Sequence, residues 1–301
     1  SSAGNASDQS YESEFRGVTD PLSPDLLFHD FDPGPGVDIL QAFELNNLES
    51  TLLSFQWDEP FASAGGAGSA NDLDILILDD FGNLLTAGAN LNVGGDAVEV
   101  VSWQNTTGAP ATYQLAIGQW LPAGGPAPNV IKYVDFNGGT SDAEYFTNSP
   151  TSFGHANAAG ALSVGAAFYG DTPAFGQTPP LAEFFTALGG VPILFDQAGN
   201  RLATPENRDN VDFTAPDGTN TTFFGSDVEP DGFPNFFGTS AAAPHAAAVA
   251  ALMQEAVPGA TPSEIEDSLK STAIDMGAPG KDRLTGAGLI QADAAIADLM
   301  G

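Results

Sequence analysis

The sequence contains no cysteine among its 301 residues, which excludes disulfide bonds and thiolate chemistry. No uninterrupted apolar run approaches the roughly 20 residues that a helix needs to cross a bilayer. The chain opens at Ser1 without the basic start and apolar stretch of a signal peptide, so any targeting segment is expected to lie upstream or never to have existed. These absences predict a protein with no membrane span. They leave the compartment open, because a secreted protein need not contain disulfides.

Basic residues are scarce as well. The sequence has 7 Lys and Arg against 39 Asp and Glu, which gives a formal net charge of −32. A surface of this kind repels nucleic acid and anionic membranes, because phosphate groups need cationic partners. The composition therefore predicts neither as a binding partner. Two interpretations of the acidity remain open: an ordinary solvated surface, or adaptation to salty water in which counterions screen the self-repulsion.

The length and the 42% hydrophobic content allow a sizeable core and favour two units. Residues 18–148 consist of short strand-like runs separated by Gly and Asn clusters, with no helical period between them. This spacing predicts an antiparallel β-sandwich, and the stretch around Phe81-Gly82-Asn83 resembles the accessory sandwich modules attached to many secreted proteases. The expected strands are Val37–Leu45, Thr51–Trp57, Leu73–Leu78, Ala97–Trp103, Ala111–Trp120 and Val130–Phe136.

After Pro150 the residue pattern changes to one typical of mixed strands and helices. Three strands are predicted, at Ala158–Ala167, Phe184–Leu188 and Val211–Ala215. Three helices are predicted as well: an alanine-rich one at Ser240–Ala256, expected to be buried on all sides, a capped one from Thr261 to Thr272, and a closing one at Leu289–Met300. The sequence therefore predicts a discontinuous α/β domain, residues 1–17 and 149–301, interrupted by an inserted all-β domain, residues 18–148.

The stretch Gly238-Thr239-Ser240-Ala241-Ala242-Ala243-Pro244-His245 carries the strongest chemical signal. Gly238 permits a tight entry to the predicted helix, and Ser240 stands at its start. The first N–H groups of a helix have no partner within the helix, and the helix dipole adds partial positive charge there. Such donors can stabilise the oxyanion that forms when a serine attacks a carbonyl group. The pattern therefore predicts Ser240 as a nucleophile.

This stretch resembles the serine motif of the subtilisin-like proteases, the subtilases. Further collinear segments resemble the same family: Ala161–Ala166, Asp212–Gly218, which is similar to the family's Ala-Pro-Gly segment with Asp217 intruding, and Arg283–Ile290. The resemblance covers about residues 1–17 and 149–301. It implies a partial subtilisin-like parallel-sheet domain, a serine endopeptidase that cleaves peptide bonds through an acyl-enzyme on Ser240, protein or peptide substrates, and a secreted or cell-envelope location.

The N-terminal run Ser2-Ala3-Gly4-Asn5 matches a second motif of the family. By resemblance, Asn5 donates its side-chain amide to the oxyanion, opposite the N–H of Ser240. Ser2, Ala3 and Gly4 line one wall of the pocket for the residue before the scissile bond. The related sedolisin proteases carry Asp where subtilases carry Asn, so Asn5 favours the subtilases.

A serine nucleophile needs a positioned base, usually a histidine oriented by a carboxylate. The family places its Asp and His motifs before the Asn segment, and neither motif occurs in this sequence. Of the three histidines, His29, His155 and His245, none has the expected context. We therefore expect this chain alone to be inactive, as a shortened or cleaved form that lacks the N-terminal half of the catalytic domain. The alternative is a non-catalytic secreted module, with a protease-like scaffold and a sandwich that binds protein or polysaccharide.

No cofactor is predicted. Asp72, Asp74, Asp79 and Asp80 supply the oxygen ligands that calcium prefers. However, Asp72 and Asp74 alternate with apolar residues, as on a solvated strand face, and the spacing reproduces no known calcium loop. The sequence therefore gives no support for a metal site.

Overall fold

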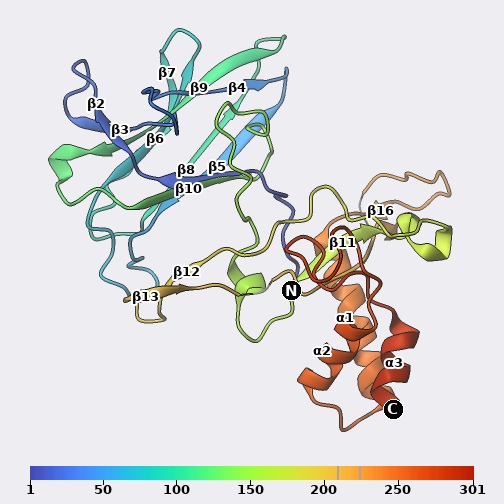
Figure 1. Cartoon of the computed structure of the whole chain (residues 1–301). Coiled ribbons are helices and arrows are strands. Elements are labelled where there is room, and N and C mark those ends of the chain that lie inside the picture. Colours follow the sequence, from blue (N-terminus) through green and yellow to red (C-terminus); the bar gives the residue numbers. More distant parts are fainter. Residues whose placement is uncertain (209, 224) are drawn as a thin grey trace. The chain divides into compact units, whose positions relative to one another are not determined.

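The structure is a computed structural model that describes residues 1–208, 210–223 and 225–301. The chain divides into two compact units (Figure 1). The first unit, called here the serine unit, consists of residues 1–8, 150–191 and 207–301. The second, called here the β unit, consists of residues 9–149 and 192–206.

The serine unit is built around two parallel strands, β11 (Val164–Phe168) and β14 (Phe213–Asp217), which pair from Val164 opposite Phe213 to Phe168 opposite Asp217. Ser2 adds a parallel bridge to Val164 on one side, and Leu289 adds one to Thr214 on the other. The strands are buried almost throughout, and their small alanine side chains let a helix pack closely against them.

Three helices complete this core: α1 (Thr239–Ala256), α2 (Pro262–Ser271) and α3 (Ala292–Met300). They lie together at the C-terminal end of the chain (Figure 1). Thr261 and Glu264 cap α2 reciprocally, as the sequence predicts. The buried side chains of the three helices and of β11 and β14 form one cluster that includes Val164, Phe213, Met253 and Leu269.

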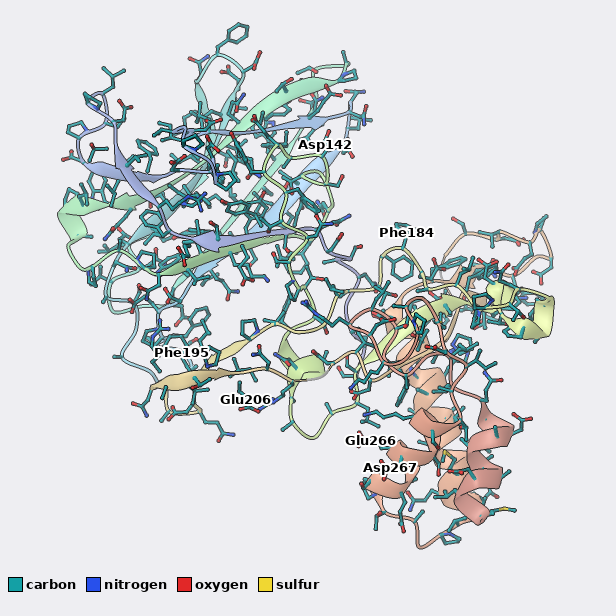
Figure 2. The ribbon with its side chains drawn as sticks, in the orientation of Figure 1. Asp142, Phe184, Phe195, Glu206, Glu266 and Asp267 are labelled. Atoms are coloured by element: carbon teal, nitrogen blue, oxygen red, sulfur yellow. The ribbon has the colours of Figure 1, made fainter. Side chains whose placement is uncertain are left out.

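Three sequence predictions for the serine unit are wrong in detail. Helix α1 is not buried on all sides, since Leu252 is 51% exposed; an alanine-rich helix without charge still exposes a face, because alanine covers little apolar area. The strand predicted at Ala158–Ala167 begins only at Val164, after a short 3-10 helix at Gly154–Asn157. Phe184–Leu188 forms no strand, and the side chain of Phe184 projects into solvent (Figure 2).

The β unit contains two sheets in which all paired strands are antiparallel. One sheet has the order β1-β10-β5-β8, and the other has the order β2-β3-β9-β6-β7, with β4 also paired to β9. The strands are β1 (Ser10–Glu14), β2 (Gly17–Thr19), β3 (Leu26–His29), β4 (Gln41–Leu45), β5 (Ser50–Trp57), β6 (Leu73–Asp79), β7 (Leu84–Gly88), β8 (Val98–Gln104), β9 (Ala111–Trp120) and β10 (Val130–Asp135).

Side chains from both sheets meet in one hydrophobic cluster, in which Phe55 and Tyr133 come from the first sheet and Ile75 and Leu115 from the second. Along β4 and β6 buried residues alternate with less buried ones, as expected for strands with one face on a core. A separate hairpin, β12 (Ile193–Phe195) and β13 (Arg201–Glu206), also belongs to this unit. Arg201 on the hairpin forms an ion pair with Asp58, at 2.7 Å.

The boundaries between the units differ from the prediction, which assigned residues 1–17 and 149–301 to one domain and residues 18–148 to the other. Residues 10–14 pair along their whole length with β10, so the N-terminal segment leaves the serine unit after Asp8 instead of after Gly17. The two ends of the segment 9–149 meet where the Ser10 hydroxyl contacts Ser149. The segment 192–206 was not predicted to join this unit.

Candidate active site

Ser240 is the second residue of α1 and its side chain is exposed. The residue that enters the helix, Gly238, has φ +128° and ψ 153°, a conformation that residues with a side chain rarely adopt. A glycine here therefore sets the sharp turn by which the chain presents Ser240 at the start of a helix.

The backbone N–H groups at this helix start are nearly all in use. The Gly238 N–H donates to Asp217 Oδ2 at 2.6 Å, and the Thr239 N–H donates to Asn5 Oδ1 at 3.0 Å. The next two helical amides after Ser240 bond back to the Gly238 carbonyl. The Ser240 N–H donates to no residue that the structure describes. It is the free donor of the turn, at the positive end of the helix dipole.

Asn5 reaches this turn from the N-terminal segment, which runs beside β11. The Ala3 N–H donates to the Val164 carbonyl at 3.0 Å, and the Val164 N–H donates to the Ser1 carbonyl at 2.8 Å. Asn5 Oδ1 accepts two hydrogen bonds from Thr239, one from its N–H and one from its hydroxyl at 2.7 Å. Because the amide oxygen is engaged twice, the amide nitrogen must face the other way, and it donates to no described group.

The two free donors lie close together. A Cβ built on Gly238 would lie 3.2 Å from Asn5 Nδ2 and 3.7 Å from the Ser240 backbone nitrogen. The two nitrogens are therefore at most 6.9 Å apart, the total of those two lengths. One oxygen about 3 Å from each donor fits such a gap, which is the geometry required to bind an oxyanion. The proximity of Asn5 and Ser240 predicted from the sequence is present.

Ser2, Ala3 and Gly4 lead into this site along the edge of the short sheet. Ala3 is 2% exposed, so its side chain faces the core. Gly4 has φ +111°, its N–H donates to the Thr239 hydroxyl at 3.2 Å, and its carbonyl accepts from the Ala187 N–H at 2.9 Å. A side chain on Gly4 would press on the Ala187 methyl group. These contacts hold the segment firmly against the serine turn.

No histidine that the structure describes hydrogen-bonds to Ser240. His245, on the same helix, uses Nδ1 for a 2.8 Å contact with the Ala241 carbonyl. His155 lies in the 3-10 helix at Gly154–Asn157. His29 is buried in the β unit, where Nε2 meets the Tyr11 hydroxyl and Nδ1 accepts from the Arg16 N–H. The described residues thus place an exposed serine beside two free N–H donors, and no described histidine hydrogen-bonds to that serine.

Two features of the site were not predicted from the sequence. Thr239 is fully buried and connects Gly4 to Asn5 through its hydroxyl. Asp217, whose side chain accepts the Gly238 N–H, and Glu183 both have raised pKa values. Burial raises the pKa of Glu183 to about 7, with the charge of Asp217 as the next cause, and burial likewise raises the pKa of Asp217 to about 6. The threonine is a common residue with no signal in isolation. The aspartate was visible in the sequence only as a departure from the family pattern.

Among the described residues, no three His, Asp or Glu side chains are arranged to hold a metal ion. In the same residues no helix combines the length and apolarity needed to span a bilayer.

The sequence profile of the subtilase family matches residues 106–288. That range covers more than half of the 301 residues and includes Ser240. The chain is a member of the subtilase family. The match starts inside the β unit and does not include Asn5.

Three relatives match shorter stretches of this subtilase. The minor extracellular protease Epr of Bacillus subtilis is 38% identical over 100 residues, 33% of this chain and 15% of Epr. The alkaline elastase YaB of a Bacillus species is 36% identical over 101 residues, 33% of this chain and 25% of the elastase. Fervidolysin of Fervidobacterium pennivorans is 44% identical over 59 residues, 20% of this chain and 8% of fervidolysin. The matched stretches span a quarter or less of each relative.

Solved structures of proteases also resemble the chain. The CspB protease of Clostridium perfringens aligns over 100% of this chain and 58% of its own, with 16% identity and a TM-score of 0.49. A lanthipeptide protease aligns over 46% of this chain and 41% of its own, with 22% identity and a TM-score of 0.32. TM-scores below 0.5 add nothing to the family assignment.

Proposed function

We propose that this subtilase is the nucleophile-bearing part of a serine endopeptidase that hydrolyses peptide bonds through an acyl-enzyme on Ser240. The observation that carries the proposal is the pair of free donors, Asn5 Nδ2 and the Ser240 N–H, held no more than 6.9 Å apart beside an exposed serine hydroxyl. Such donors stabilise the oxyanion more than the ground-state carbonyl, which is the requirement for accelerating acyl transfer.

The proposed reaction has two steps. Ser240 Oγ attacks the peptide carbonyl carbon while its proton passes to a base, and the oxyanion that forms accepts from Asn5 and from the Ser240 N–H. The C–N bond then breaks, the amine leaves with that proton, and water hydrolyses the ester on Ser240. We propose that the base and its carboxylate partner belong to a part of the complete protein outside these 301 residues.

The substrates proposed are proteins or peptides. The segment Ser2-Ala3-Gly4 would form one wall of the pocket for the residue before the scissile bond, since the contacts of Gly4 with Thr239 and Ala187 fix it beside the oxyanion donors. An exported protein is proposed as well. The Epr relative is named as extracellular, and a strongly acidic surface keeps a protein soluble in salty surroundings.

We further propose that the β unit is an accessory antiparallel sandwich inserted into the protease domain. Its two sheets share one hydrophobic core, and the ends of its segment 9–149 meet at Ser10 and Ser149, as an insertion requires. Proximity of the two ends allows an inserted domain to leave its host fold undisturbed.

A fluorophosphonate probe tests the proposed function, because it labels only a serine activated by a base. The complete gene product should be labelled at Ser240 and should digest an unfolded protein, and its S240A variant should do neither. This 301-residue chain alone should resist rapid labelling. A complete gene product that is neither labelled nor proteolytic would contradict the proposal and favour the non-catalytic module.

A further inference from the structure

The paired strands β5 and β8 of the β unit (Figure 1) carry a hollow of about 540 Å³ at one of their ends. Two lining residues, Ser50 and Thr51, come from the start of β5, and three come from the end of β8, namely Ser102, Trp103 and Gln104. Ser50 lies opposite Gln104 and Thr51 opposite Trp103, so the pairing of the strands fixes these residues relative to one another. Small-molecule sites typically have volumes of about 300–1,000 Å³, so the hollow is large enough for such a ligand.

The lining of the hollow is polar but carries no charge. Besides the five strand residues it contains Thr106, from the loop after β8, and Asn137, from the loop after β10. An ionic ligand would lose hydration there without meeting an opposite charge on the lining. A protein partner is disfavoured as well, because protein interfaces are anchored by large aromatic and apolar side chains, and Trp103 is the one such side chain in the lining. The lining therefore fits a neutral ligand rich in hydroxyl groups.

A buried carboxylate below the hollow holds Thr51 and the loop of Asn137 in place. Asp135, the last residue of β10, is completely buried. Its Oδ1 accepts from the N–H groups of Leu52 and Asn137, at 3.1 and 3.0 Å. Its Oδ2 accepts from the Thr51 hydroxyl at 3.0 Å, and from the N–H and the hydroxyl of Thr140 at 2.8 and 3.0 Å. With five hydrogen bonds the carboxylate is satisfied without a cation.

A buried amide holds the loop that carries Thr106. Asn105 is completely buried, and its Nδ2 donates to the carbonyl groups of Leu45 and Ala109, at 2.7 and 2.8 Å. Its Oδ1 accepts from the N–H and the hydroxyl of Thr107, at 3.0 and 2.8 Å. Both loops are thus ordered by bonds within the β unit, and a site that is already ordered loses little conformational entropy when a ligand binds.

Several hydrogen-bonding groups of the hollow remain available. The side chains of Ser102 and Thr106 are exposed, and neither hydroxyl bonds to a described residue. The Trp103 ring packs edge to face with Tyr113, and its buried Nε1–H has no acceptor among the described residues. A hydroxyl both donates and accepts, so Ser102 and Thr106 match the hydroxyl groups of a ligand in either role.

The two amide side chains of the hollow are oriented by their nitrogens. Gln104 Nε2 donates to the Leu48 carbonyl at 3.0 Å, and Asn137 Nδ2 donates to the Ser50 hydroxyl at 2.9 Å. Because each nitrogen is engaged, each amide oxygen faces away from that partner, and neither oxygen accepts from a described residue. The hollow therefore adds two carbonyl acceptors of fixed direction to the two hydroxyl groups.

We propose that this hollow binds a neutral saccharide, whose hydroxyl groups bond to Ser102, Thr106, Gln104 and Asn137 while its ring packs beside Trp103. Sugar hydroxyls need both donors and acceptors, and these side chains supply both without a charge. The inference goes beyond the proposed cleavage of peptide bonds and does not depend on it. It gives the β unit a binding function of its own.

The test is an NMR titration of the ¹⁵N-labelled 301-residue chain with three neutral hexasaccharides: cellohexaose, maltohexaose and the hexamer of N-acetylglucosamine. At least one of them should shift the indole resonance of Trp103 and the side-chain amide resonances of Gln104 and Asn137, with a saturable dependence on concentration. Two charged oligosaccharides, anionic oligogalacturonate and the cationic hexamer of glucosamine, should leave these resonances in place.

Variants of exposed residues then test the site itself. T106A and Q104A each remove one hydrogen bond to the sugar, so each should weaken binding by about 2- to 10-fold. Q56A is the matched control, since Gln56 is an exposed glutamine on β5 outside the hollow, and it should bind as the parent chain does. Backbone amide spectra that match the parent chain away from the substituted position show that each variant is folded.

Three results would overturn the inference. The first is the absence of a saturable shift with all three neutral hexasaccharides. The second is binding that shifts resonances elsewhere, or that T106A and Q104A weaken no more than Q56A does. The third is occupation of the hollow by a charged oligosaccharide or by an unfolded casein peptide in place of the neutral sugars. No readout requires catalysis, so failure of the proposed protease function would be seen separately, as a complete gene product without activity.

Discussion

Replacing Thr239 by valine should loosen the junction between the N-terminal segment and the serine turn. The Thr239 hydroxyl is fully buried, donates to Asn5 Oδ1 at 2.7 Å and accepts from the Gly4 N–H at 3.2 Å. Valine has the same shape but no hydroxyl, so T239V removes both hydrogen bonds and leaves the space filled.

The expected loss of folding free energy follows from the hydrogen-bonding group that T239V leaves without a partner. Asn5 Oδ1 keeps its bond from the Thr239 backbone N–H, whereas the Gly4 N–H loses its acceptor. The Gly4 N–H is partly buried, so the cost should lie toward the lower end of the range of about 1–3 kcal/mol that is typical of an unsatisfied buried donor. For a unit of roughly 150 residues each kcal/mol lowers Tm by roughly 2–4 °C. T239S retains the hydroxyl and should lose clearly less stability than T239V.

The two units can be followed separately in this assay. The three tryptophans, Trp57, Trp103 and Trp120, all lie in the β unit, while α1, α2 and α3 all lie in the serine unit. Circular dichroism at 222 nm during denaturation therefore reports mainly the serine unit, and tryptophan fluorescence reports the β unit. T239V should lower the midpoint of the transition at 222 nm and leave the midpoint of the fluorescence transition unchanged. An unchanged transition at 222 nm, or equal losses in T239V and T239S, would refute the reasoning.

Two further predictions concern other parts of the chain. Burial, with Arg16 as the next cause, lowers the pKa of His29 from 6.5 to about 3. The neutral ring therefore stabilises the folded β unit above pH 6.5, and this contribution declines as the pH falls toward 3. The denaturation midpoint detected by tryptophan fluorescence should fall over the same pH range, and H29Q should reduce this dependence on pH. T261A removes the capping box of α2 and should destabilise the serine unit by about 0.5–2 kcal/mol. T261S keeps the hydroxyl and should keep most of the stability. Equal losses of stability in the two variants, measured by circular dichroism at 222 nm, would argue against the cap.

The sequence predicts the elements whose signals are local. The capping box at Thr261 and Glu264 fixes the start of α2, and the β-branched and aromatic run at Ala111–Trp120 forms β9 with the same bounds. The strands near the N-terminus were missed, because β1, β2 and β3 have only three to five residues each, and β1 and β3 depend on pairing with β10 and β9 far along the chain. The same long-range pairing moved the boundary between the units from Gly17 to Asp8.

At the candidate site, sequence reasoning reached the residues that carry a motif and missed the ones that connect them. Ser240 and Asn5 were predicted, and the structure brings both close to Gly238. The link through Thr239 was not predicted, because a threonine hydroxyl has no sequence signature for the partner it will bond. Glu183 gave no signal either, since it lies next to a predicted strand, Phe184–Leu188, that does not form.

The most direct test of the central claim is the effect of N5A on kcat in the complete gene product. Loss of an oxyanion donor typically lowers kcat by about 10²–10³, a magnitude measured on another member of this family. We expect a fall of this size with KM nearly unchanged, because the bond to the Asn5 amide forms only as the oxyanion develops. A kcat within about twofold of the parent enzyme would show that Asn5 is not an oxyanion donor and would contradict the account.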